Sequence, residues 1–157
     1  MVKRPVYKEA TQEELIFASK DFFNRDLYLE KQTYRAWLKL KECALAEGIT
    51  LYIVSGFRSY DYQQNIIDRK LANGQTLEDI AKVNALVGES EHHTGCAIDL
   101  TTGDEQEVLT ESFENTQAFK WLNKNASKFG FVMSFPRNNQ FGFIYEPWHW
   151  CFKNEDK

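Results

Sequence analysis

The segment around which we interpret this sequence is Ser90-Glu91-His92-His93-Thr94-Gly95-Cys96-Ala97-Ile98-Asp99. Side chains that can bind a metal lie on both sides of Gly95. Glycine allows a sharp turn, so an aspartate on the following strand can return toward His92. The natural complement of this segment lies downstream, at Glu146-Pro147-Trp148-His149. We interpret the two segments together as one metal site, and the rest of the chain as its frame.

The length and composition indicate a globular protein. The chain has 157 residues, which suits a single domain over residues 1–157. Folding at this length buries about two-thirds of the unfolded surface, so one core can form. Hydrophobic residues make up 43% and aromatic residues 15%, which argues against disorder. The aromatic residues cluster near the C-terminus, where we expect core or the wall of a cleft.

Charge and hydropathy exclude two classes of partner. The net charge is −4, and no run of basic residues interleaves with aromatics, so we expect no nucleic-acid partner. The longest apolar runs, such as Leu51–Val54, are far too short for a membrane span. Lys3 and Arg4 precede no apolar segment, so we see no signal peptide. We expect a cytoplasmic monomer, or a periplasmic or extracellular protein if a leader has been removed.

The cysteines do not form a recognisable framework. Cys43, Cys96 and Cys151 are odd in number and widely spaced, and no CxxC motif occurs. A set of structural disulfides is therefore not expected, which is consistent with a reducing compartment.

Several segments carry the spacing or capping residues of helices. The strongest is Glu30–Glu47, which ends at Gly48 and has Tyr34, Trp37, Leu38 and Leu45 at helical spacing. Thr11–Phe23 is predicted as a helix because Thr11 can cap it and acidic residues follow. The other predicted helices are Tyr60–Ala72, capped by Ser59 or Asp61; Thr76 to about Leu86; and Asn115–Phe129, with Phe119, Leu122 and Ala126 inward and Gly130 at its end.

Short segments rich in apolar and β-branched residues are predicted as strands. In the segment Cys96–Thr101, alternation places Asp99 on one face and Cys96 on the other. Asn24–Leu29 is predicted as a break and Thr102–Glu111 as a loop. The remaining predicted strands are Ile49–Val54, Phe131–Ser134, Phe141–Tyr145 and Trp148–Phe152.

Three side chains suit a catalytic zinc site, which keeps three protein ligands and one position for water. The chain offers His92, Asp99 and His149. Taken singly, each has a commoner structural role, and spacing alone does not choose between His92 and His93. Cys151 shares a strand face with His149 and is an alternative ligand, although a packed thiol is its more common role.

A base and a cation accompany these residues. Glu146 is the candidate to take a proton from a metal-activated water. The segment is not the helical HExxH motif because Pro147 excludes a helix interior. The same proline interrupts the strand, which lets Glu146 turn toward the metal. Arg58 follows a strand end and offers a fixed cation for developing negative charge, with a surface ion pair as the alternative.

These residues carry a resemblance to a known family. The pattern Ser90-x-His92-x-x-Gly95-x-Ala97-x-Asp99, followed by Glu146-x-x-His149, resembles the zinc D-Ala-D-Ala carboxypeptidases of bacterial cell-wall metabolism. This family includes VanY-type, LD-carboxypeptidase and D,D-dipeptidase enzymes. The segment Ser55-Gly56-Phe57-Arg58-Ser59-Tyr60-x-x-Gln63 resembles a third motif of the family. From Ser55 onward, the resemblance covers about two-thirds of the chain.

The resemblance implies a fold and a role for each matched residue. It implies an α+β fold of the hedgehog and DD-peptidase type, a small antiparallel sheet with helices packed around it. It implies that Zn²⁺ is bound by His92 rather than His93, with Asp99 and His149, and that Cys151 is no ligand. Glu146 would be the general base and then the proton donor to the leaving amine. Arg58 would hold the substrate carbonyl and oxyanion, and Gln63 and Ser90 would help to hold the terminal residue.

We therefore expect a zinc carboxypeptidase that removes a C-terminal D-amino acid, D-Ala, from peptidoglycan stem peptides or muropeptides. The bond is of LD or DD type, and a cytoplasmic enzyme would suit wall recycling. One alternative is a non-catalytic module that binds wall peptides or a protein around a structural zinc. Such a site is normally closed by a fourth ligand, for which Cys151 or His93 is the candidate. Another is an L-Ala-D-Glu endopeptidase with the same fold.

Overall fold

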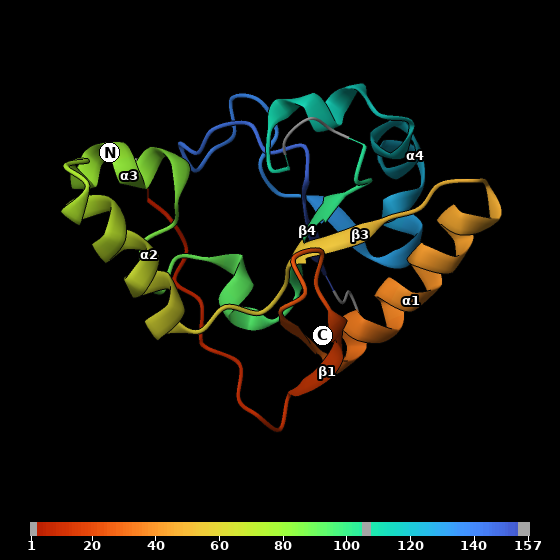
Figure 1. Ribbon diagram of the computed structural model, residues 1–157, viewed down its shortest axis with the longest axis horizontal. Coiled ribbons are helices and arrows are strands. Elements are labelled where there is room, and N and C mark those ends of the chain that lie inside the picture. The colour runs from red at the N-terminus through yellow and green to blue at the C-terminus, as the bar shows by residue number, and fades with distance from the viewer. Residues whose placement is uncertain (1–2, 105–107, 154–157) are drawn as a thin grey trace.

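The computed structural model describes residues 3–104 and 108–153 as a small antiparallel sheet surrounded by helices (Figure 1). The central sheet has the strand order β3-β4-β6-β5, and every neighbouring pair is antiparallel. Its strands are β3 (Tyr52–Ser55), β4 (Ala97–Thr101), β5 (Phe131–Met133) and β6 (His149–Phe152). A separate hairpin pairs β1 (Leu15–Lys20) with β2 (Asp26–Glu30). The expected α+β fold is confirmed.

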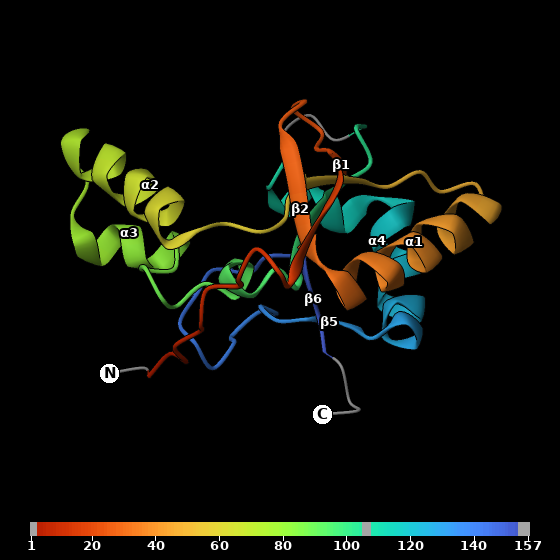
Figure 2. The ribbon, with the colours of Figure 1, turned by 90° about the horizontal axis from the view of Figure 1, so that it is seen from below.

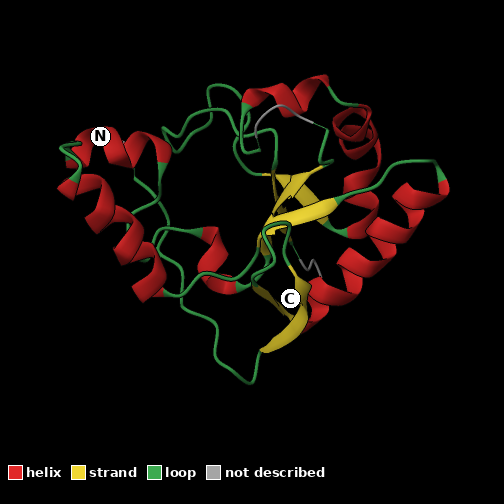
Figure 3. Cartoon of the chain, viewed as in Figure 1, coloured by secondary structure: helices red, strands yellow, loops and turns green. Residues whose placement is uncertain are grey.

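The helices form two groups on opposite sides of the central sheet. On one side lie α1 (Lys31–Ala46) and α4 (Gln117–Asn125), and on the other lie α2 (Tyr60–Ala72) and α3 (Leu77–Val83) (Figures 1 and 2). Short 3₁₀ helices are η1 (Glu91–Thr94), η2 (Glu111–Asn115) and η3 (Ala126–Phe129). Loops join the second helix group to the strands (Figure 3). Within the described ranges, no helix has the length and apolar character needed to cross a bilayer.

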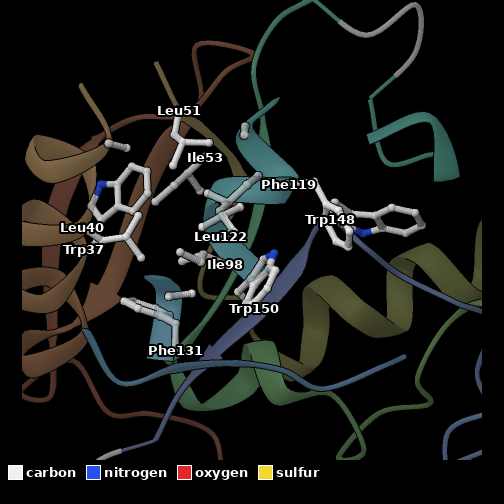
Figure 4. Close-up of a cluster of buried hydrophobic side chains, with 14 of the residues drawn as sticks. Trp37, Leu40, Leu51, Ile53, Ile98, Phe119, Leu122, Phe131, Trp148 and Trp150 are labelled. Carbon is white, nitrogen blue, oxygen red and sulfur yellow. The ribbon is translucent and has the colours of Figure 1, made fainter. Parts of the chain in front are cut away.

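The core fills the space between the sheet and the first helix group. Its side chains come from the inner face of α1, from α4 and from the central strands (Figure 4). The largest members include Trp37, Leu40, Leu51, Ile53, Ile98, Phe119, Leu122, Phe131, Trp148 and Trp150. β4 lies between β3 and β6, and all five of its residues are buried. The strand is thereby held on both edges and both faces.

The predicted helices with clear caps are confirmed. Glu30 caps α1 by accepting from the backbone N–H groups of Gln32 and Thr33. Ser59 caps α2 and Thr76 caps α3 in the same way, at positions predicted from the sequence. Helix α3 ends at Val83, earlier than expected. The predicted segment Asn115–Phe129 contains the end of η2, α4 and η3, and it ends at Gly130 as expected.

The N-terminal prediction is wrong. Thr11–Phe23 is a turn followed by β1, and the predicted break at Asn24–Leu29 contains most of β2. The hydroxyl and N–H of Thr11 both donate to Glu14, so this capping pattern closes a turn and no helix follows. β2 buries Leu27 and Leu29 at alternate positions, which is the pattern of a strand with one covered face.

Two further predictions are corrected. Phe141–Tyr145 is a loop, because the Asn139 side chain accepts from the N–H of Phe141 and donates to the carbonyl of Phe143. In α1 the buried positions are Thr33, Trp37, Leu40 and Ala44, whereas the predicted Leu38 and Leu45 are exposed. The other predicted strands are confirmed, although their first or last residues differ from the prediction by one to three positions.

The segment Thr102–Glu111 is predicted as a loop. Its described part is loop up to η2, and residues 105–107 lie outside the described residues.

Two leucines on α1 provide a matched test of this core. Leu40 is fully buried, whereas Leu38 is 44% exposed on the same helix. We expect Leu40→Ala to lower the free energy of unfolding by about 2–5 kcal/mol, because it leaves a cavity. Leu38→Ala should change it by roughly 0.5 kcal/mol or less. Denaturant unfolding measures both, and equal losses would contradict the observed orientation of α1.

Candidate metal centre

Two neighbouring strands and a 3₁₀ turn bring together His92, Asp99 and His149. Asp99 on β4 lies directly opposite His149 on β6, and His92 comes from η1. The Asp99 carboxylate lies 3.2 Å from His92 Nε2 and 2.9 Å from His149 Nδ1. One ligand atom from each residue lies within 4.8 Å of the others, and all three residues are buried. The group can therefore hold a metal ion.

Gly95 makes the turn that joins η1 to β4. Its φ is +76°, in the left-handed region that glycine adopts readily. A Cβ there would lie 2.8 Å from Leu15 Cδ2 and 2.9 Å from the backbone nitrogen of Glu30. The backbone can therefore approach the β1–β2 hairpin only if this residue is glycine.

Both histidine rings are held by their outer nitrogens. His92 Nδ1 lies 2.7 Å from the carbonyl oxygen of Gly56 and donates to it. His149 Nε2 lies 2.8 Å from Glu91 Oε1. Each ring thus keeps its other nitrogen facing Asp99, which is the orientation that a shared metal requires.

The alternative ligands lie outside this group. His93 uses both ring nitrogens, since Nδ1 donates to the Arg58 carbonyl and Nε2 accepts from the N–H of Gly88. Cys151 lies opposite Ala97 on the neighbouring strand. Burial raises the pKa of the Cys151 thiol far above its usual range in the metal-free protein, and Cys151 does not belong to the group of residues that can share a metal.

Glu146 faces the metal-binding group. Residues 147 and 148 form a turn, and the backbone N–H of His149 donates to the carbonyl of Glu146. The Glu146 carboxylate consequently lies 3.9 Å from His149 Nδ1. Burial raises the pKa of Glu146 to about 7 in the metal-free protein. A carboxyl group of this kind can take up and release a proton near neutral pH.

Arg58 reaches the same group from the end of β3. Its guanidinium lies 3.6 Å from the buried Asp99 carboxylate, and its Nε donates to the Ser55 hydroxyl. Its own backbone N–H donates to the carbonyl of His92. Arg58 therefore contacts Asp99 through its side chain and His92 through its backbone. The alternative from the sequence, an ion pair on the protein surface, is not what the structure shows.

A cavity of about 260 Å³ opens beside these residues. Gln63 and Ser90 both line it, together with the metal-binding group, Glu146 and Arg58. Gln63 donates to the carbonyl of Ala85, while its buried Oε1 accepts no hydrogen bond from the described residues. The hydroxyl of Ser90 accepts from the N–H of His92 and so caps η1.

Electrostatically, the metal-free centre is a compact cluster of alternating charges. Burial opposes the imidazolium form of His149, but hydrogen bonds to Asp99 and Glu91 outweigh it and raise the pKa of His149 to about 10. Burial likewise opposes the Asp99 carboxylate, but the two histidines lower its pKa well below the usual range. The pKa of His92 is lowered, chiefly by burial.

Sequence reasoning missed Glu91. This residue lies between two motif positions, yet only its contact with His149, which is 58 positions further along the chain, brings it to the site. The motif spacing contains no signal for that contact, because it depends on how η1 packs against β6.

Comparison with known proteins identifies the family. The model of the VanY family, described as D-alanyl-D-alanine carboxypeptidase, matches residues 26–155. The chain belongs to the VanY family. YodJ of Bacillus subtilis (strain 168) is 37% identical over 127 residues, covering 78% of this chain and 45% of that protein. A D-alanyl-D-alanine carboxypeptidase of Enterococcus faecium is 25% identical over 158 residues, covering 94% and 47%. The chain thus spans under half the length of these two relatives.

Solved structures share the fold of this VanY-family chain. The LD-carboxypeptidase LdcB matches with a TM-score of 0.81 and 32% identity, covering 93% of this chain and 69% of that chain. A variant of the vancomycin-resistance D,D-pentapeptidase VanY, in complex with Zn(II), matches with a TM-score of 0.74 and 23% identity, covering 99% and 88%. The expected family and fold are therefore confirmed.

Two glycines with positive φ test the turn at Gly95. Gly48 has φ +82°, and a Cβ added there would meet nothing within 4 Å, so it is the control. Alanine at either site adopts an unfavourable backbone conformation, which costs roughly 1 kcal/mol or more. We expect Gly95→Ala to lose more unfolding free energy than Gly48→Ala, because its Cβ also collides with the hairpin. Denaturant unfolding of both variants measures the difference, and equal losses would argue against the crowding.

Proposed function

We propose that this chain is a zinc-dependent carboxypeptidase acting on peptidoglycan stem peptides. It would hydrolyse the amide bond before a C-terminal D-Ala, of LD or DD type. The observation that carries the proposal is the convergence of His92, Asp99 and His149 on one point, with Glu146 beside it. The match to LdcB, described as an LD-carboxypeptidase, supports the choice of reaction and substrate class.

The donor set fits Zn²⁺. Two imidazole nitrogens and one carboxylate are ligands that zinc accepts, and three protein ligands leave a position open, as in catalytic sites. The similar fold of VanY in complex with Zn(II) supports this choice. When bound, the ion would polarise the scissile carbonyl and make a water molecule more acidic.

The chain's own residues account for the remaining chemistry. Glu146 would take a proton from the attacking water as its oxygen bonds to the scissile carbon. The same carboxyl group would then deliver that proton to the amide nitrogen as the C–N bond breaks. Arg58 would donate to the carbonyl oxygen, where negative charge develops. Its link to Asp99 supports this role, because the guanidinium is already aimed at the centre.

The cavity supplies contacts for the terminal residue of the substrate. The free Oε1 of Gln63 is an acceptor for an N–H group, and burying a polar atom without a partner is costly unless a ligand satisfies it. Ser90 would contribute its hydroxyl as a donor, because the oxygen already accepts from His92. These two contacts would hold the leaving residue beside Arg58.

Defined muropeptides test the proposed reaction directly. We expect purified protein with Zn²⁺ to release D-Ala from a tetrapeptide, a pentapeptide or both, and mass spectrometry of the products distinguishes LD from DD cleavage. A metal chelator should abolish the release, and added Zn²⁺ should restore it. Failure to release D-Ala from either substrate in the presence of Zn²⁺, or cleavage between L-Ala and D-Glu instead, would overturn the proposal.

The role of Glu146 has its own test. Glu146→Gln keeps the size of the side chain but cannot accept the proton, so we expect turnover to fall by about 10²- to 10⁴-fold. The zinc content should be unchanged, because Glu146 is not in the ligand group. Steady-state assays and metal analysis of the same preparation measure both. Unchanged turnover would remove Glu146 from the mechanism.

A further inference from the structure

Glu91 is a buried acid that the proposed reaction does not use. It is only 5% exposed, and a buried carboxylate is unfavourable unless it is paired. Its Oε1 lies 2.8 Å from His149 Nε2, and its Oε2 lies 3.2 Å from Lys153 Nζ. Each of its oxygens therefore has a partner of its own. Glu91 does not belong to the group of atoms that can share a metal.

The contact with Glu91 decides which nitrogen of His149 faces that group. The neutral imidazole that binds a metal carries one N–H, and an acceptor at one nitrogen leaves the lone pair on the other for the ion. Glu91 accepts from Nε2, so Nδ1 is the nitrogen that faces Asp99 at 2.9 Å. His92 is held in the same way by the neutral carbonyl of Gly56. At the outer ring nitrogen, the one that faces away from Asp99, His149 has a charged partner and His92 has a neutral one.

Other contacts hold the His149 ring without choosing its donor atom. The ring of Phe135 lies against it, with centroids 4.6 Å apart and an interplanar angle of 33°. The backbone of His149 is paired with β4. Neither contact distinguishes one ring nitrogen from the other, so on the side of the ring away from Asp99 the choice rests on Glu91.

The charge of Glu91 also suits a divalent ion. A dication bound to one carboxylate and two neutral imidazoles keeps a net charge of +1 in a buried site. Glu91 supplies a second negative charge on the side of His149 away from Asp99. Through its hydrogen bond to Nε2, this charge makes the imidazole of His149 a stronger electron donor to the ion. Its contacts with His149 and Lys153 offset the cost of burying this carboxylate.

We propose that Glu91 is a positioning residue of the metal centre, whose carboxylate fixes the donor nitrogen of His149 and thereby strengthens metal binding. Lys153 holds the outer oxygen of the carboxylate and limits its rotation. This inference rests on the proposed zinc site. It adds a residue that never contacts the ion or the substrate.

Zn²⁺ affinity, measured by competition with a chelating dye, tests the role of Glu91. We expect Glu91→Ala to bind Zn²⁺ about 10- to 100-fold more weakly, the usual effect of losing such a partner. Glu91→Gln should recover part of this loss, because its amide oxygen can still accept from Nε2. Glu89→Gln is the control: it lies in the same loop, and its carboxylate is 3.8 Å from Arg4 and pairs with no metal-binding residue.

A spectroscopic readout separates positioning from a general loss of stability. In the Zn²⁺-loaded protein we expect the proton on His149 Nε2 to exchange slowly and to be visible in ¹H–¹⁵N NMR spectra. Glu91→Ala should abolish this signal, whereas Glu91→Gln should keep it. If the alanine variant does not fold, comparing the glutamine variant with Lys153→Met still decides: Glu91→Gln should bind Zn²⁺ more weakly than the unmodified protein, and equal affinity would overturn the inference. Lys153→Met leaves the Glu91–His149 contact intact and should keep both the signal and most of the affinity.

The outcomes distinguish this inference from the proposed function. If the unmodified protein does not bind Zn²⁺ tightly, the zinc site itself is wrong. If it does, and Glu91→Ala binds with the same affinity, the inference alone is overturned. An equal loss of affinity in Glu89→Gln would overturn it as well, because the effect would then be general to the loop.

Discussion

The antiparallel pairing of β4 with β6 is the constraint on which the site depends. It places Asp99 directly across from His149, and one of the two partners would turn to the other face if the register slipped by a single residue. Buried neighbours enforce the register, since β4 is covered along its whole length and β6 is flanked by β5. The same packing that stabilises the fold therefore determines the geometry of the centre.

Concentrating so many ionisable groups in the interior is costly. Asp99, Glu91, His92 and His149 are all buried, and each charge requires a partner to offset its loss of hydration. In the metal-free protein His149 bridges the two carboxylates. A metal ion would displace the proton on the inner nitrogen of His149 and take over its contact with Asp99, so metal binding and proton release are coupled. The cluster is thus already arranged for a cation before one arrives.

The site lies where the two helix groups meet the sheet. The strands and η1 carry the candidate metal ligands, whereas α2 brings Gln63 to the wall of the cavity. Figure 1 shows α2 and α3 set apart from the other helices, joined to the sheet through loops. Asp99 and His149 thus lie on two buried central strands, and α2 contributes to the wall of the cavity beside them. The proposed function rests on this site, since a shared fold alone does not establish an activity.

The sequence alone determined the features that depend on neighbouring residues. The caps at Ser59 and Thr76 and the turn at Gly95 are each set by a few adjacent residues, and the motif spacing nominated His92, Asp99 and His149 as candidate metal ligands. The family followed from the same spacing. Tertiary structure decided the rest: Thr11–Phe23 became a turn and a strand because pairing with β2 outweighed a local capping pattern. Glu91 joined the centre, and His93 turned away from it, through contacts between segments distant in the chain. Such contacts depend on the register and packing of the folded protein, which no short stretch of sequence encodes.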